Sequence, residues 1–550
     1  MVRSKKLKSA VKLVLSAAIT AGLIGGIAQV GAQSTGGMEG YDAPRYPRFV
    51  INPTKEELMA QARVAVRQTA GRAPLGNMKS GETAYVVLEY EQDQEVWNAI
   101  KTAWQERGVE AKVIPSYEIY GMSKKDFDAQ QSKNYLNGGD GWMEWKIFES
   151  VYATFLPESV QATFKNPIPS QKEMGGASPT ATVPPFILYL RKHPEIKNFY
   201  AWMGGGGIQK AIFRAHMPEA VAMFRGNWTF TRKADLMNKM TSFPGDAWKM
   251  VDEEMVRPIG HVSEGWITDP EGTNMHWTLT PTQSIEWDKR SGVANLNPNH
   301  LNLYPPPVLA TWPEGIVIRA EASHTGYYPT MTVHMDQHGK VVQIEGGGRN
   351  GDLFRMMLNH PLFRDVKFPS APEPGYWYLA QDGFATNPKA IRNIEELMEG
   401  SPGLVNTAER ERAGVQHFAF SGPMPIEGRD PRDVAVAKEQ GLPLTHTAHM
   451  HNYFTTIKWR LRDTGEIVTV SEKGHPEIFK SAELRALASK YGNPDTIFSY
   501  DWVPDMPGVN MPGNHDRDYG ADPFAFLKAE WALLKSGKYT HYVENYDVTK

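Results

Sequence analysis

Apolar positions early in the chain predict a strand, a helix and a second strand in succession. Residues 83–89 form a largely apolar run that is typical of a buried strand. The apolar residues that follow recur with the spacing of one helical face: Val96, Ala99, Ile100, Ala103 and Trp104. Residues 110–114 are expected as the next strand. Because a strand–helix–strand unit of this length joins parallel strands, the pattern predicts a parallel α/β sheet.

The pattern changes from about residue 258, where short alternating runs favour β-structure. Residues 330–335 and 340–345 flank Asp336-Gln-His-Gly, which indicates a β-hairpin. Elsewhere along the chain we expect strands at residues 184–189, 316–321, 417–420 and 454–462, and helices at 55–69, 391–398 and 523–534.

The fold class predicted from these patterns is α/β: an N-terminal parallel α/β domain is followed by a β-rich α+β domain. Residues 117–180 lack a regular pattern, which indicates an insertion over the α/β core. The expected division of the chain is a signal peptide (1–32), the α/β domain with its insertion (33–257), the β-rich domain (258–489) and a C-terminal extension (490–550).

The N-terminus has the layout of a Sec-type signal peptide. Four lysines lie within the first twelve residues, a largely apolar run covers residues 13–30, and small residues precede a cleavage point near Ala32. The apolar run is short and rich in Gly and Ala, so a cleaved signal is favoured over a membrane anchor. We therefore expect a periplasmic or secreted protein without a stable membrane anchor after cleavage.

The amino-acid composition excludes cysteine chemistry and makes nucleic acid an unexpected partner. The chain has no cysteine, which removes disulfides, thiolate ligands and cysteine nucleophiles. Without the expected signal peptide, 54 basic residues face 62 acidic ones, which gives a formal charge of about −8. Since no basic stripe is present, nucleic acid is not an expected partner.

A histidine cluster late in the sequence is the strongest candidate for chemistry. His449 and His451 form a His-x-His pair, which in an extended strand places both rings on one side. His417 lies in another expected strand and can supply a third imidazole. Because neutral imidazole is the commonest metal ligand, this arrangement makes a metal site geometrically accessible. A solvated strand edge is the alternative interpretation.

Two further segments contain residue types that metal sites use. Asp269-Pro-Glu-Gly-Thr has the composition of a turn into a strand, and it could equally place Glu271 in a site. Pro512-Gly-Asn-His-Asp contains a string found in metallophosphoesterases, but the partner motifs of those enzymes are missing. A surface turn is therefore the favoured interpretation of residues 512–516.

Several segments, taken in order, resemble one known superfamily. They are Asp93-Gln-Glu-Val-Trp-Asn-Ala-Ile, Thr268-Asp-Pro-Glu-Gly-Thr-Asn-Met, Asn295-Leu-Asn-Pro-Asn-His, Glu409-Arg-Glu-Arg-Ala-Gly-Val-Gln-His-Phe-Ala-Phe-Ser-Gly and His449-Met-His. This order resembles the thermophilic-type metallo-aminopeptidases, whose superfamily also contains the 2,5-dihydroxypyridine 5,6-dioxygenases. The resemblance implies an α/β domain followed by a β-rich metal domain.

Carried over by position, the resemblance implies a metal site with altered ligands. His417 and His449 match metal-binding histidines, and His451 falls where the family has a metal-binding Asp. Glu409 or Glu411 lies near a ligand Glu, and His300 replaces another Glu. These three residues are the candidates for orienting substrate or moving protons. Loss of bridging carboxylates favours one divalent metal, with Fe(II) preferred and Zn(II) or Co(II) as alternatives.

The implied function is that of an exported mononuclear metalloenzyme, most like a non-haem Fe(II) ring-cleaving dioxygenase. Its substrate would be a small aromatic molecule, and Tyr327, Tyr328 and Tyr453 could line a ring-sized pocket, although core packing explains each of them as well. The alternatives are a metal-dependent aminopeptidase acting on short peptides and a non-catalytic periplasmic binding protein. A homo-oligomer remains open.

Overall fold

The structure is a computed structural model of the 550-residue chain. It describes residues 37–47, 52–88, 92–135, 179–201, 213–214, 216–295, 301, 303, 310–323, 326–392, 394, 398, 409–422, 430–440, 442, 448–537 and 542–543. The expected signal peptide (1–32), His300 and most of the helix expected at 391–398 lie outside the described residues.

The first sheet is parallel and confirms the predicted strand–helix–strand unit. Its strands follow the order β3–β2–β4–β5: β2 (Thr83–Leu88), β3 (Glu110–Pro115), β4 (Phe199–Tyr200) and β5 (Phe224–Gly226). Helix α3 (Gln94–Glu106) joins β2 to β3, and the Asp93 side chain caps it by accepting hydrogen bonds from two backbone amides of its first turn. The apolar face of α3 is buried, with Ile100 and Trp104 fully enclosed.

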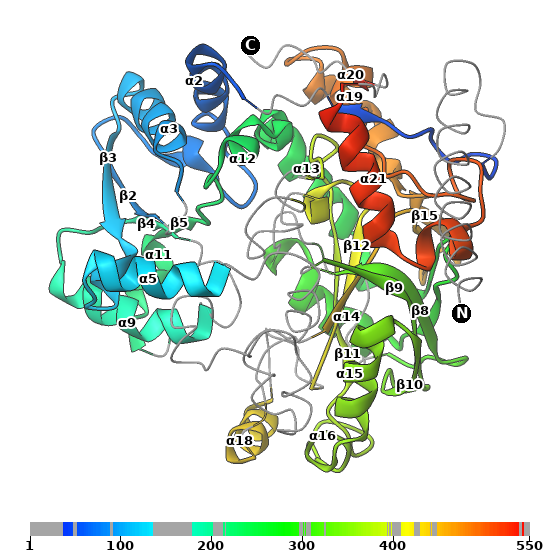
Figure 1. The fold of residues 1–550 in the computed structure, drawn as a ribbon. Helices are drawn as coiled ribbons and strands as arrows, with labels where there is room; N and C mark the ends of the chain where they lie inside the picture. Colours follow the sequence, from blue (N-terminus) through cyan, green and yellow to red (C-terminus); the bar gives the residue numbers. More distant parts are fainter. Residues whose placement is uncertain are drawn as a thin grey trace, which may run out of the picture.

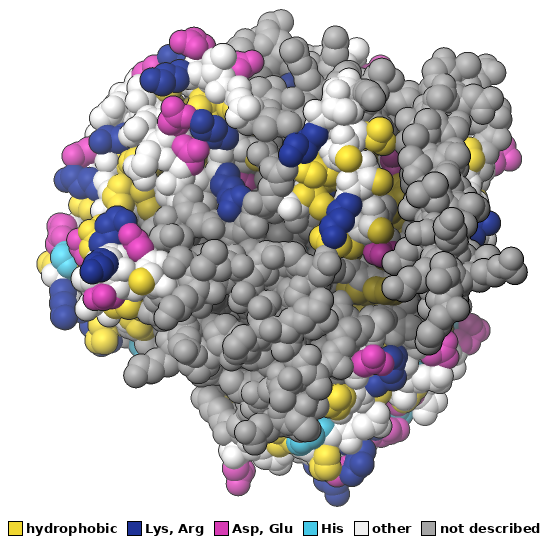
Figure 2. Space-filling view, in the orientation of Figure 1, with side chains coloured by type: hydrophobic (Ala, Val, Ile, Leu, Met, Phe, Trp, Pro, Cys, Tyr) yellow, Lys and Arg dark blue, Asp and Glu magenta, His cyan; other side chains and the backbone are white. Residues whose placement is uncertain are grey.

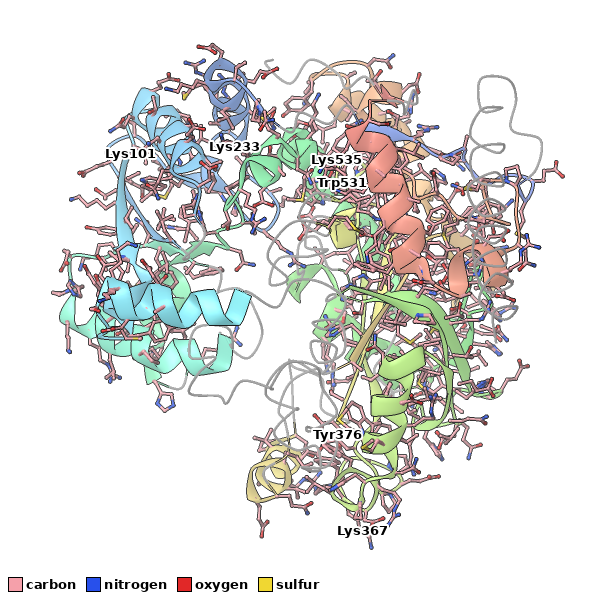
Figure 3. All side chains as sticks on the ribbon, viewed as in Figure 1. Lys101, Lys233, Lys367, Tyr376, Trp531 and Lys535 are labelled. Carbon is pink, nitrogen blue, oxygen red and sulfur yellow. The ribbon has the colours of Figure 1, made fainter. Side chains whose placement is uncertain are left out.

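Two helices lie beside α3 at the outer side of this sheet (Figure 1). Helix α2 (Lys55–Ala65) forms at the predicted place, and its Arg63 makes an ion pair of 2.8 Å with Glu106 of α3. Helix α12 (Lys233–Met237) contributes Lys233, which is labelled in Figure 3 and pairs with Glu95 of α3. These contacts pack α2, α3 and α12 into one layer over the parallel strands.

The prediction of a strand at residues 184–189 is wrong, because these residues belong to helix α9 (Pro179–Lys192). A short apolar run cannot by itself distinguish a buried strand from a buried helical segment. Burial in the structure recurs at Phe186, Ile187 and Leu190, which is helical spacing. Helix α5 (Lys124–Tyr135) falls within the range expected as an irregular insertion.

The second sheet is antiparallel and has eleven strands. Its main order is β11–β12–β13–β8–β7–β6–β14–β15–β16, and β9 pairs with both β8 and β10. The strands are β6 (Val262–Thr268), β7 (Asn274–Thr278), β8 (Ile316–Ser323), β9 (Gly326–Met335), β10 (Val341–Gly346), β11 (Tyr378–Phe384), β12 (Gln416–Ser421), β13 (Ala448–Asn452), β14 (Thr456–Leu461), β15 (Ile467–Glu472) and β16 (His475–Pro476). The strands predicted at 316–321, 417–420 and 454–462 and the hairpin around residue 337 are confirmed.

Helices between the strands complete a mixed α/β architecture. They include α13 (Gly245–Val256), α14 (Pro281–Ser291), α15 (Gly348–Asn359), α16 (Pro361–Arg364), α18 (Pro431–Glu439), α19 (Ala482–Ala488) and α20 (Pro494–Phe498). The largest apolar cluster surrounds the antiparallel sheet and takes in Trp248 of α13, while two smaller clusters surround the parallel sheet. The exact domain boundaries stay predictions.

The C-terminal extension lies against the antiparallel sheet. Helix α21 (Pro523–Lys535) confirms the helix expected at 523–534 and packs against β9, as the red helix in Figure 1 shows. Its start is capped by Asp522, and Trp531 and Lys535 stand one turn apart on it (Figure 3). The short helix η8 (Asp516–Gly520) precedes it and also packs on β9.

The segment expected as a surface turn, residues 512–516, is only partly a surface feature. Its other residues are exposed, but the His515 side chain is turned inward and is only 12% exposed. The turn interpretation missed this because a composition rich in Gly, Pro and Asn predicts the backbone and not the direction of one ring.

Charges of both signs are interspersed over the described part of the face in Figure 2. Large exposed apolar side chains in the described ranges are scattered, as at Leu188 and Ile285. Within the same ranges, none of the helices has the length and apolar character needed to cross a membrane.

We predict that Gly414→Ala destabilises the protein by more than about 3 kcal/mol, measured by chemical denaturation. Gly414 begins the turn into β12 with φ of 85°, and an added Cβ would clash with the carbonyl group of Gly474. The matched control is Gly465→Ala, where φ is 72° but nothing lies within 4 Å of the added atom. That variant should lose only about 1 kcal/mol, and equal losses in the two variants would contradict the steric argument.

Candidate metal centre

The antiparallel pairing of β12 with β13 brings the three predicted histidines together. His417 on β12 lies directly opposite His451 on β13, and His449 lies opposite Ala419. Side chains opposite each other in a sheet share a face, and residues two apart on a strand share it as well. His417, His449 and His451 therefore point to one side of the sheet, as the His-x-His spacing predicts.

The distances between the rings are close to those of a shared metal site. The ring centres of His417 and His451 are 5.7 Å apart, and those of His417 and His449 are 6.0 Å apart. Imidazoles that bind one metal at about 2.1 Å have ring centres about 5 Å apart. The ring nitrogens of the three histidines do not all lie within 4.8 Å of one another, so the rings would have to rotate to share one ion.

The residues beside the histidine pair are small. In the same cross-strand row, Gly383 of β11 pairs with His417, and Ala322 of β8 pairs with His451. His417 and His451 are 1% and 0% exposed, whereas His449 is partly accessible. The row thus offers two buried imidazoles without bulky neighbours in register and a third that faces the outside.

A buried carboxylate network adjoins this row. Tyr327 of β9 is the register partner of Ala322, so it follows His451 on the same face with one strand between. The Tyr327 hydroxyl donates to both oxygens of Glu409 at 2.7 and 2.8 Å, and the Tyr453 hydroxyl donates to the same carboxylate. Burial raises the pKa of both phenols well above the usual range, so both tyrosines keep their protons and act as donors.

Arg392 links Glu409 to a second buried carboxylate. Its guanidinium lies 3.3 Å from oxygens of Glu409 and 3.3 Å from Glu530 of α21, and it stacks over Trp502 at 4.6 Å. Glu409 has two phenol donors in addition to Arg392. Burial raises the pKa of Glu530 to about 8, so Glu530 holds a proton at neutral pH.

Glu411 belongs to another contact. Its carboxylate is fully buried and pairs with Arg72, which lies between α2 and the parallel sheet. Burial raises the pKa of Glu411 to about 7, against the opposing effect of Arg72. The two candidate glutamates of the short helix η6 (Glu409–Glu411) thus separate: Glu409 joins the tyrosines, and Glu411 joins the N-terminal part of the chain to the antiparallel sheet.

The other predicted site residues stand apart from this group. Tyr328 points to the opposite face from Tyr327 and donates to the Ala322 carbonyl at 3.0 Å. His300 lies outside the described residues, so its expected role stays a prediction.

Sequence reasoning missed Arg392 and Glu530. One available signal was the position of Glu530, which falls on the buried stripe of an otherwise apolar helix, next to Leu527 and Trp531. A carboxylate there needs a partner or a proton. Arg392 had no comparable signal, because its two carboxylate partners are 17 and 138 residues away in sequence.

Comparison with known proteins gives distant likenesses. No family model matches the chain, and no curated protein matches its sequence. Two solved structures, wild-type AmpT from Thermus thermophilus and 2,5-dihydroxypyridine dioxygenase from Pseudomonas putida KT2440, are each 12% identical with a TM-score of 0.37 and match 77% of this chain. The matches cover 99% and 97% of those chains, respectively. At this low similarity, function has to be inferred from the chain's own side chains.

We predict that Glu530→Gln changes the pH dependence of stability. Between about pH 5 and pH 8 folded Glu530 holds a proton that the unfolded chain has released, so the free energy of unfolding falls as pH rises. Glutamine removes this titration. The stability of the variant relative to the wild type should therefore rise by about 3 kcal/mol across this range.

Chemical denaturation at a series of pH values measures this difference, because groups that titrate alike in both proteins cancel. Exposed Glu483, at the start of α19, provides the control Glu483→Gln, which should run parallel to the wild type. A constant difference between Glu530→Gln and the wild type from pH 5 to pH 8 would show that Arg392 keeps Glu530 ionised.

Proposed function

We propose that the chain is an exported, mononuclear metal-dependent enzyme, most like a non-haem Fe(II) dioxygenase that opens a hydroxylated aromatic ring. The observation that carries the proposal is the convergence of His417, His449 and His451 on one face of the antiparallel sheet. The motifs that resemble the 2,5-dihydroxypyridine dioxygenases supply the reaction class.

The surroundings of the histidines favour one metal over two. A two-metal hydrolase needs carboxylates that bridge ions about 3.5–4 Å apart. The cross-strand row through His417 and His451 continues with Gly383, Ala322 and Tyr327, none of which is a carboxylate. Of the two candidate glutamates, Glu409 already accepts hydrogen bonds from two tyrosines and faces Arg392, and Glu411 pairs with Arg72.

The donor set fits a divalent ion of the first transition row. Neutral imidazole suits Fe(II), Zn(II) and Co(II), and three nitrogen ligands leave coordination positions open. When Fe(II) is bound there, it supplies the redox chemistry that lets O₂ react with an electron-rich ring. One O₂ is then consumed for each ring opened, and both oxygen atoms enter the product.

The chain's own residues would bind and orient the ring. Tyr327 and Tyr453 present aromatic surface beside the histidine row, and their hydroxyl groups are held by Glu409. Ala322 lies between His451 and Tyr327 in register, and His449 is the partly accessible histidine of the three.

Anaerobic loading of the mature chain with Fe(II) tests the proposal. We expect the histidine cluster to bind one iron tightly per chain. We also expect O₂ uptake with a panel of dihydroxylated benzenes and pyridines. His449→Ala should lose this iron and at least about 99% of the O₂ uptake, because a two-nitrogen site binds iron weakly. His261→Ala is the matched control, since its side chain is 64% exposed and pairs with Asp463 far from β13.

Elemental analysis and an oxygen electrode give the two readouts. Circular dichroism confirms that His449→Ala is folded. Iron content and O₂ uptake unchanged in His449→Ala would overturn the proposal. Two zinc or cobalt ions per chain, together with release of N-terminal residues from peptides, would replace it with an aminopeptidase.

A further inference from the structure

A second group of ligand-type side chains lies on the other face of β8. Glu271, Glu321 and His515 each offer one atom, and these atoms all lie within 4.8 Å of one another. Within the described residues, no other set of three or more carboxylate and imidazole side chains has its ligand atoms this close together. Alternation along β8 places Glu321 opposite in direction to Ala322, and hence opposite to the histidine row.

Each member is positioned by local structure. Asp269 accepts hydrogen bonds from the backbone amides of Gly272 and Thr273, both at 2.9 Å, and this closes the loop that presents Glu271. The pairing of β8 with β9 shifts between Ala320 and Ala322, so Glu321 stands at a strand irregularity. Such irregularities commonly aim a side chain into a site.

Glu271 is buried without a hydrogen-bond donor. Its side chain is 2% exposed, and neither carboxylate oxygen accepts a hydrogen bond within the described part of the chain. The two ring nitrogens of His515 likewise meet no partner at hydrogen-bond geometry there: Nε2 is 3.7 Å from Glu321 and Nδ1 is 3.7 Å from Asp516. Glu321 itself accepts one hydrogen bond, from Thr330 at 2.6 Å. Buried polar groups are rarely left this way unless a ligand completes them.

Arg319 does not neutralise the two carboxylates directly. It donates to the backbone carbonyl of Glu271 and pairs with the carboxylate of Asp516, and its charge reaches Glu271 and Glu321 without a direct ion pair to either side chain. Two buried carboxylates and an imidazole whose ligand atoms lie this close together form a donor set that a divalent cation would complete.

We infer that Glu271, Glu321 and His515 form a binding site for one divalent cation that fastens the C-terminal segment to the antiparallel sheet. Two carboxylate oxygens and one imidazole nitrogen suit Mn(II) or Zn(II). Glu271 lies in the loop between β6 and β7 and Glu321 lies on β8, whereas His515 precedes η8 and α21, so a shared ion links distant parts of the chain. The site is independent of the histidine cluster.

The inference is tested with Mn(II) on the chelator-treated mature chain. Electron paramagnetic resonance measures free Mn(II) during a titration. We expect one Mn(II) per chain in the wild type, and at least tenfold weaker binding in Glu271→Gln and in Glu321→Gln. Mn(II) should also raise the thermal unfolding midpoint of the wild type by a few degrees and leave that of Glu271→Gln unchanged.

Two controls separate this site from other sources of binding. Glu345→Gln removes a carboxylate that is 57% exposed on β10 and should bind Mn(II) as the wild type does. His449→Ala should also keep its Mn(II), so loss of the histidine site and loss of this site are distinguishable. The inference is overturned if the wild type binds no Mn(II), which would mean that the two glutamates share a proton instead. His515→Ala is a second variant in case Glu271→Gln does not fold. Mn(II) affinity equal to that of the wild type in whichever of the two variants is folded would overturn the inference as well.

Discussion

The register between β12 and β13 is the constraint on which the candidate chemistry depends. A shift of one residue would turn His417 to the other face of the sheet and separate it from His451, because side chains alternate with a period of two. The start of β12 is fixed by Gly414, whose backbone conformation and close approach to Gly474 leave no room for a side chain. This tight backbone contact fixes where β12 begins, and the pairing of β12 with β13 then brings the three imidazoles together.

Buried charge sets a second constraint, because Arg392 must serve two carboxylates. The Glu409 carboxylate accepts hydrogen bonds from the hydroxyl groups of Tyr327 and Tyr453 in addition to its ion pair with Arg392. Glu530 is left with a shared contact and a raised pKa. This arrangement anchors helix α21 against the sheet by a protonated group, and it holds Glu409 and its two tyrosines in a fixed orientation beside the histidine row.

Local patterns predicted what depends on local spacing. The period of two in His449-Met-His placed two rings on one face, and the helical stripe through Ile100 and Trp104 located α3. The run at 184–189 failed because its length suits both a strand and a helix, and packing against the first sheet decided between them. Arg392 and the inward turn of His515 were not predictable, because their partners are brought together only by the tertiary fold.

Strand β8 connects the two clusters and gives them different environments. Ala322 points into the histidine row, whereas Glu321 points to the opposite face, towards Glu271 and His515. β8 also lies between β13 and β9, so its position sets the distance from His451 to Tyr327. A cation bound by Glu321 would restrict the irregular pairing of β8 with β9 without contacting anything on the other face. The two sites can therefore be chemically separate and still depend on the same strand for their geometry.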